Sequence, residues 1–91
     1  MSIFDKKSPN SDEIFEILHK QKNIEITHIV SSSKLSDILY DQDEDEFVIV
    51  LEGEAVLNIE EQRVCLKKGE YIFIKAHEKH RVLNCKDNTH W

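Results

Sequence analysis

From residue 24 onward the chain consists of short apolar runs separated by turns, and this pattern constrains the fold more than any other feature. Residues 24–30 alternate with a period of two, which is typical of a β-strand. Further candidate strands, rich in β-branched and aromatic residues, follow at 35–40, 47–51, 55–59, 64–66, 71–74 and 81–84. Short strands at such regular intervals predict an all-β sandwich or barrel.

A different pattern precedes the strands. Asn10 and Glu13 have the spacing of a capping box, in which each side chain satisfies the backbone N–H group of the other residue. The apolar residues after them recur at helical spacing: Ile14, Ile17 and Leu18. The sequence therefore predicts one short amphipathic helix over 11–21, which docks on the barrel because a lone helix of this length is marginal in water.

The length of the chain, 91 residues, predicts a single domain over residues 1–91. A domain of this size buries a modest share of its surface, and burial of an apolar sheet face against a twin subunit is a natural way to stabilise it. We therefore expect a homodimer. The net charge of −6, with 18 acidic and 12 basic residues, argues against a nucleic-acid partner.

The distribution of apolar residues indicates where the protein is expected to reside. The sequence contains no apolar run long enough to cross a membrane and no apolar stretch of a secretory signal near its N-terminus. Cys65 and Cys85 are too few for a disulfide framework, and both lie in apolar alternating stretches where a free cysteine behaves as a small buried hydrophobe. A cytoplasmic protein without a membrane partner is expected.

Two motif spacings resemble those of the cupin superfamily. Glu46, six residues and Gly53 fit the end of the first cupin motif. Gly69, five residues, the segment 75–80, three residues and Asn84 fit the whole length of the second motif, in which His80 is the histidine. The resemblance covers residues 24–91 and implies a double-stranded β-helix, or jelly-roll barrel, in which one more strand is expected to follow Trp91.

The first cupin motif is only partly present. Tyr40 and Gln42 stand where the family has its two histidines, and the Pro-x-Gly turn of the second motif is replaced by residues 75–77. Residues 40–46, Tyr-Asp-Gln-Asp-Glu-Asp-Glu, resemble a subgroup of small bacterial cupins of undefined function that lacks this histidine pair. His80 alone remains of the usual histidine triad.

The resemblance implies a site inside the barrel with an atypical set of ligands for a divalent metal such as Fe, Mn, Ni or Zn. The metal-ligand candidates are His80, Glu46 and Gln42, and an amide in place of imidazole should lower transition-metal affinity. Candidates for lining the pocket are Tyr40, His77 and His28.

Three functions stay open on this basis, and the sequence does not decide whether the protein is an enzyme. The first is a small cupin barrel of unassigned activity with an atypical metal site. The second is a metal-free barrel that binds a small ligand or a partner as a sensory or accessory module. The third is a purely structural dimerisation unit, which a barrel interior filled by apolar side chains would favour.

Overall fold

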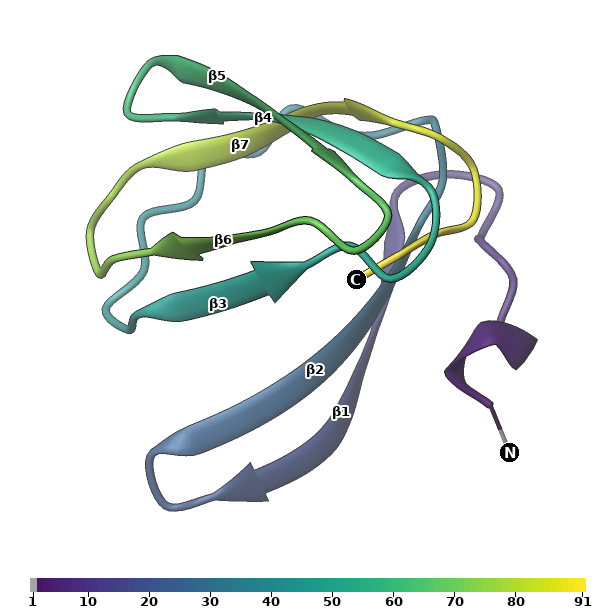
Figure 1. Ribbon diagram of the computed structural model, residues 1–91, viewed down its shortest axis with the longest axis horizontal. Helices are drawn as coiled ribbons and strands as arrows, with labels where there is room; N and C mark the ends of the chain where they lie inside the picture. Colours follow the sequence, from purple (N-terminus) through teal and green to yellow (C-terminus); the bar gives the residue numbers. More distant parts are fainter. Residues whose placement is uncertain (1) are drawn as a thin grey trace.

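The computed structural model describes residues 2–91, and almost all of its regular structure is β-strand (Figure 1). A short 3-10 turn, η1, precedes the strands. The elements are η1 (Ile3–Asp5), β1 (Glu13–Gln21), β2 (Ile24–Ser31), β3 (Glu46–Ile49), β4 (Glu54–Ile59), β5 (Gln62–Lys67), β6 (Tyr71–Ile74), β7 (His80–Cys85) and β8 (Thr89–His90).

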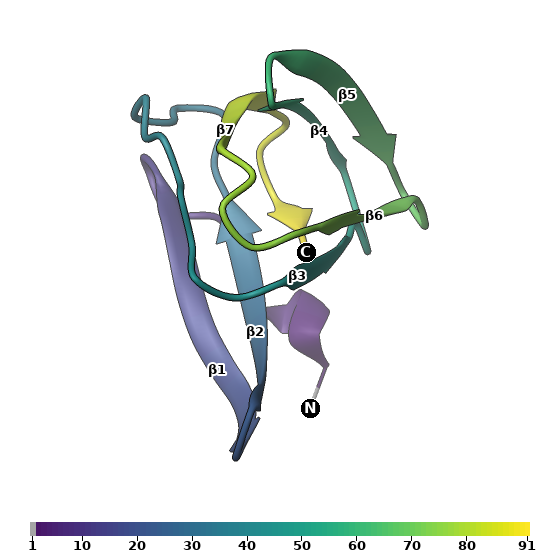
Figure 2. The same cartoon turned by 90° about the vertical axis from the view of Figure 1, so that its left-hand side faces the viewer.

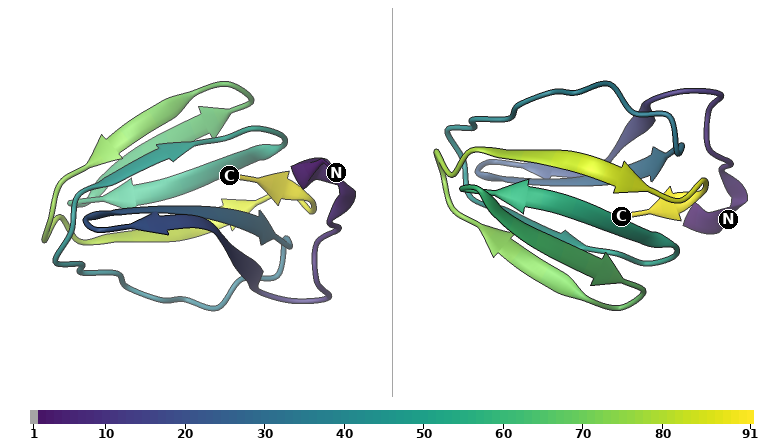
Figure 3. Two further views of the ribbon diagram at one scale, coloured as in Figure 1. Left: turned by 90° about the horizontal axis from the view of Figure 1, so that it is seen from below. Right: turned by 90° about the horizontal axis from the view of Figure 1, so that it is seen from above.

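The strands form two layers that face each other across the core, as Figures 2 and 3 show. The strand orders are β1-β2-β8, β3-β6 and β5-β4-β7, and all pairs are antiparallel. A β-bridge between Glu52 and His90 connects the segment after β3 to β8. A second β-bridge, between Tyr40 and His80, connects the loop before β3 to β7. The predicted all-β barrel is therefore confirmed.

The core lies between the two layers and is small. It consists of the apolar side chains that point inward from β4, β5, β6 and the ends of β3, β7 and β8: Val50, Ala55, Leu57, Ile59, Leu66, Ile74, Cys85 and Trp91. Ser31 accepts a hydrogen bond from the Trp91 indole at 2.8 Å, so the one polar atom of this ring is satisfied. Of the two cysteines, Cys85 is buried and Cys65 is exposed.

The predicted helix over 11–21 is wrong, because these residues form β1. They pair with β2 in a hairpin whose turn contains Lys22 at φ 47°. The register shifts between Ile17 and His19, so Leu18 is an extra residue that breaks the period-two pattern and imitates helical spacing. Pairing with a neighbouring strand outweighs the local preference for a helix, because intrinsic helix propensity is weak. The first barrel layer therefore begins at β1, ahead of the predicted start at residue 24.

The predicted strand over 35–40 is also wrong, since only Tyr40 forms a β-bridge there. The last strand, β8, was not predicted; it has two residues and pairs with Val30 and Ser31 of β2. Within residues 2–91 we find no helix that is long and apolar enough to span a membrane.

Candidate functional site

His80 is the centre of the candidate site. It begins β7, and its side chain is almost completely buried, with 6% of the residue exposed. Its Nδ1 atom lies 3.0 Å from the carbonyl oxygen of Glu78. Because a carbonyl oxygen only accepts hydrogen bonds, the neutral imidazole carries its hydrogen on Nδ1 and a lone pair on Nε2. This lone pair is directed to the inside of the barrel.

Glu46 faces that lone pair. It begins β3 and pairs with Ile74, whose side chain is in the core, so the Glu46 carboxyl also points inward. Its Oε2 atom is 4.0 Å from Nε2 of His80, which is beyond hydrogen-bonding distance. Burial raises the pKa of Glu46, and the nearby His80 partly opposes this rise. The two groups therefore leave a gap that one hydrogen-bonding atom can bridge.

Tyr40 connects this pair to the mouth of the barrel. Its ring stacks on that of His80, with centroids 5.5 Å apart and an interplanar angle of 22°. Burial raises the pKa of Tyr40, and the negative charges of Glu13, Glu46 and Asp12 raise it further. The hydroxyl therefore stays protonated and available as a donor among carboxylates.

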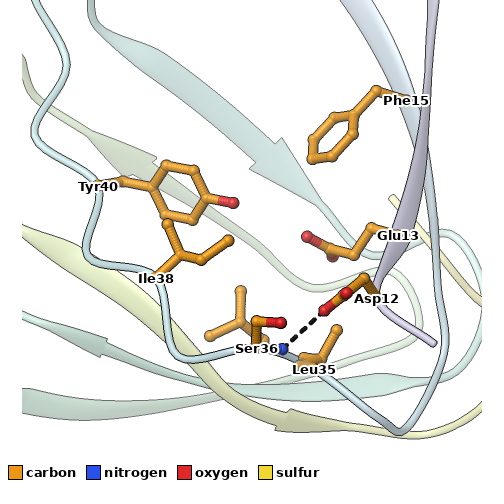
Figure 4. Close-up of a pocket in the computed structure, with 8 residues that line it drawn as sticks. Asp12, Glu13, Phe15, Leu35, Ser36, Ile38 and Tyr40 are labelled. Carbon is orange, nitrogen blue, oxygen red and sulfur yellow. Dashed lines mark hydrogen bonds between the residues drawn. The ribbon is translucent and has the colours of Figure 1, made fainter.

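A small pocket of about 80 Å³ lies beside Tyr40 (Figure 4). Its polar groups include Glu13, which accepts a hydrogen bond from Ser31 and whose pKa is raised by burial. Asp12 accepts a hydrogen bond from the backbone of Ser36 at 2.7 Å. The lining residues, none of them basic, are Asp12, Glu13, Phe15, Leu35, Ser36, Ile38, Tyr40 and Val82.

Glu13, Asp12 and Phe15 were not among the site residues predicted from the sequence. Their place in the pocket depends on β1, which the sequence pattern presents as a helix. Pairing of Glu13 with Ser31 brings the start of β1 next to the barrel mouth, and no local signal in the sequence announces this contact.

Two other predicted site residues are joined by a backbone hydrogen bond: Gln42 in the loop before β3 and His77 in the turn before β7. The backbone carbonyl of Gln42, a half-buried residue, accepts a hydrogen bond from the N–H group of His77 at 2.8 Å. The His77 side chain is 66% exposed, and its Nδ1 atom is 3.1 Å from Asp41. Neither Gln42 nor His77 lines the pocket beside Tyr40.

The last predicted pocket residue, His28, lies on the opposite face of β2 from the core. Ile29 and Ser31 of this strand point to the core, so the alternation places His28 outside. There its Nε2 atom is 2.9 Å from Nδ1 of His90, and the two rings are stacked at 12°. Both histidines are 3% exposed, and the Phe4 ring lies 5.2 Å from that of His90.

The donor set does not fit a resident transition metal. Such a site normally uses three or four protein ligands, drawn from imidazole, thiolate and carboxylate groups. In residues 2–91 no group of three or more His, Cys, Asp or Glu side chains is arranged to hold an ion. His80 and Glu46 supply at most two ligands, so the barrel lacks the complete ligand set that the family resemblance implies.

Comparisons with known proteins identify the class to which this barrel belongs. The family model for the cupin domain Cupin_2 matches residues 35–90, more than half of the chain. The chain is therefore a member of this cupin family. No significantly similar sequence was found among curated proteins.

Solved structures include a similar protein over the full length of the chain. It is named a "putative mannose-6-phosphate isomerase" from Ralstonia eutropha JMP134, with 28% identity and a TM-score of 0.88 over 100% of this chain and 91% of that one. A conserved protein of unknown function from Streptococcus pyogenes has 17% identity and a TM-score of 0.76, covering 90% and 72%. A cupin superfamily protein from Desulfitobacterium hafniense DCB-2 has 15% identity and a TM-score of 0.73, covering 91% and 78%. The last two likenesses concern the fold alone.

Proposed function

We propose that this protein is a ligand-binding cupin that acts as a sensory or accessory module and recognises a small polar molecule without a resident metal. The observation that carries the proposal is the 4.0 Å gap between the Nε2 lone pair of His80 and the carboxyl group of Glu46. A hydroxyl group or a protonated amine can donate to either of these acceptors, and Tyr40 provides a third polar contact beside them.

The charge of the site favours a neutral or cationic ligand over an anionic one. Asp12 and Glu13 line the pocket, the charge of Glu46 also raises the pKa of Tyr40, and the pocket lining contains no Lys or Arg. The name of the Ralstonia relative raises a sugar phosphate as a candidate. A phosphate group placed among these carboxylates would lack a cationic partner, so we favour a hydroxyl-rich or amine-bearing molecule.

The size of the pocket favours recognition of a small group. A volume of about 80 Å³ holds on the order of five water molecules, since each requires about 10–15 Å³. The site therefore fits one short polar arm of a ligand, with Phe15, Leu35 and Ile38 in contact with its apolar part.

The test uses nuclear magnetic resonance titration of the ¹⁵N-labelled protein with three probes: a neutral hexose, its 6-phosphate and a short alkyl diamine. We expect the hexose or the diamine to shift the amide signals of Tyr40, Glu46 and His80. The variant Glu46→Gln should weaken that binding by about tenfold or more, because it replaces a charged acceptor. Glu44→Gln, an exposed change in the same acidic run, should leave it unaltered.

Three results would contradict the proposal: no response to any probe, tighter binding of the phosphate than of the hexose, or equal effects of the two variants. A parallel titration with Mn(II), Fe(II), Ni(II) and Zn(II) tests the remaining alternative, a metal site with His80 and Glu46 as its protein ligands. Stoichiometric binding below micromolar concentration, abolished by His80→Gln, would establish a metal site in place of the metal-free one.

A further inference from the structure

A buried serine connects the pocket beside Tyr40 to the core of the barrel. Ser31 is the last residue of β2, lies opposite Glu13 in the β1–β2 pair and is 0% exposed. Its hydroxyl contacts two side chains: the indole of Trp91 in the core and the carboxyl of Glu13, which lines the pocket. A hydroxyl that water cannot reach needs partners in the protein, and these two contacts provide them.

The direction of each hydrogen bond in this chain follows from the groups that form it. The indole Nε1–H of Trp91 only donates, so the Ser31 oxygen accepts from it at 2.8 Å. The single hydroxyl hydrogen of Ser31 is then donated to Oε2 of Glu13. Because consecutive hydrogen bonds polarise one another, the indole strengthens the bond to the carboxylate. Ser31 occupies only one carboxyl oxygen, which leaves Oε1 for a ligand.

The thiol of Cys85 is close to this chain but does not compete for the carboxylate. It donates a hydrogen bond to the backbone carbonyl of Ser32 at 3.0 Å. Burial raises the pKa of Cys85 to about 11, and the charge of Glu13 acts in the same direction, so the thiol is neutral near pH 7. The hydroxyl of Ser31 therefore remains the donor that holds Glu13.

The surroundings of Glu13 favour a positive charge in the pocket. Its carboxyl and the hydroxyl of Tyr40 point toward one another across the pocket (Figure 4). Burial raises the pKa of Glu13, the hydrogen bond from Ser31 lowers it, and the charge of Asp12 raises it again. A cation at this carboxyl would offset both burial and the repulsion from Asp12, whereas a neutral hydroxyl group would offset neither.

We infer that Ser31, held in place by Trp91, positions the Glu13 carboxylate to bind an ammonium group of the ligand at the mouth of the barrel. The inference rests on the proposed function and narrows its ligand from a hydroxyl-rich or amine-bearing molecule to an organic ammonium ion. Ser31 is a positioning residue, because its complete burial keeps it from touching the ligand. It fixes the carboxyl in one orientation before the ligand arrives, so less freedom is lost on binding.

The hydrogen-bond chain is tested first without a ligand. Trp91 is the only tryptophan, so the protein has one indole N–H signal in nuclear magnetic resonance spectra. We expect this signal to move with pH at the same midpoint as the side-chain carboxyl carbon of Glu13. Ser31→Ala should raise the midpoint of the carboxyl carbon, because it removes the hydrogen bond that lowers the pKa. Glu13→Gln should abolish the movement of the indole signal, whereas Glu25→Gln, an exposed change on β2, should preserve it.

Binding of the short alkyl diamine is then measured by calorimetry. Glu13→Gln should weaken it about tenfold or more, because the charged acceptor is lost. Ser31→Ala and Trp91→Phe should each weaken it about threefold or more, since the carboxyl must then be ordered on binding. Ser32→Ala is the matched control: Ser32 is 1% exposed, and its hydroxyl bonds to the carbonyl of Asp12 at 2.9 Å. Its backbone N–H keeps a second bond to that carbonyl, so diamine binding should not change.

Thermal unfolding shows that each variant is folded at the temperature of the measurement. The inference alone is overturned if the indole signal ignores the ionisation of Glu13, or if Ser31→Ala and Ser32→Ala weaken diamine binding equally. It is also overturned, with the proposed function intact, if the neutral hexose binds and the diamine does not. If no probe binds, both the inference and the proposed function fail.

Discussion

The barrel has two buried histidine sites, one in its interior at the start of β7 and one on the outer face of β2 and β8, and their chemistry differs although their burial is similar. Inside, His80 is 6% exposed, holds one nitrogen against a carbonyl oxygen and turns the other toward Glu46 at 4.0 Å. Outside, His28 and His90 are 3% exposed and bond to each other at 2.9 Å. The difference teaches that burial alone does not identify a binding residue. What matters is an available atom that faces a second polar group.

The two sites also respond to pH in opposite directions. Burial lowers the pKa of His28 and of His90 below their usual 6.5, and in His90 the charge of His28 acts in the same direction. Burial raises the pKa of Glu46 above its usual 4.5. Acidification therefore lowers the stability of the fold at the outer histidine pair and removes the cost of an ionised carboxyl at the inner site. This contrast can be tested by mutation.

The largest expected effect comes from Gly53→Ala, which acts on the outer site. A Cβ atom there would lie 2.5 Å from Oγ1 and 2.8 Å from Cα of Thr89, and the residue has a φ of +88°. The overlap pushes β8 away and separates His90 from His28, at a cost of about 2–5 kcal/mol of unfolding free energy. Urea denaturation provides the measurement.

Gly69→Ala is the control for this prediction. Gly69 has a φ of +83°, but an added Cβ would meet nothing within 4 Å. The control therefore costs only the backbone strain, about 1 kcal/mol. Equal losses for the two variants would show that β8 does not depend on the close approach at Gly53.

The next effect concerns the outer histidine pair. Because the folded pKa values lie below 6.5, this pair contributes its full stability above pH 6.5 and loses it as the pH falls through the folded values. Glu16 and Glu52 oppose these shifts, and Lys6 adds to that of His28. His28→Gln should flatten the loss of thermal stability between pH 7 and pH 5. An unchanged profile would contradict the pair as the cause.

A smaller effect of opposite sign is expected for the inner site. The pKa of Glu46 is raised in the folded state. Its contribution to the free energy of unfolding is therefore complete below pH 4.5 and is lost as the pH rises through the folded pKa. Glu46→Gln removes this dependence, and the variant should gain thermal stability relative to the unaltered protein between pH 5 and pH 8. A relative loss over this range would mean that the ionised carboxylate is stabilised by contacts with His80.

The smallest effect is expected for His77, which is exposed and belongs to neither site. Its φ of +66° is a conformation that favours glycine, but its Nδ1 atom also contacts Asp41 at 3.1 Å. His77→Gly exchanges the strain for this exposed contact, so the net change in unfolding free energy should be below about 1 kcal/mol. Urea denaturation is the measurement, and a loss clearly above this value would show that the contact with Asp41 outweighs the backbone strain.

Much of the barrel could be predicted from the sequence because its strands alternate locally. Strand positions from residue 46 onward follow from β-branched runs, from the turn glycines Gly53 and Gly69, and from motif spacing. The first strand could not be predicted in this way. In β1 the extra residue Leu18 breaks the alternation, and only pairing with β2 shows that the segment is extended.

The candidate site, too, could be predicted from the sequence only in part. Spacing alone selected Glu46 and His80, and the fold brings them to opposite sides of a 4.0 Å gap with Tyr40 beside them. Glu13 is 33 residues before Glu46 in the sequence, and its role in the pocket depends on a hairpin that local patterns do not predict. Sequence periodicity thus predicts which neighbours along one strand share a face, whereas contacts between strands depend on the register of pairing.

The amino-acid sequence by itself therefore determined the class of fold, the turn positions and the identity of the central acid and base. The tertiary structure decided which atoms of those groups remain available, which histidines satisfy one another across 62 residues of chain, and which apolar side chains stay on the outside. The physical reason is that hydrogen-bond partners, desolvation and exposure are properties of surroundings assembled from distant segments, and a local pattern does not contain them.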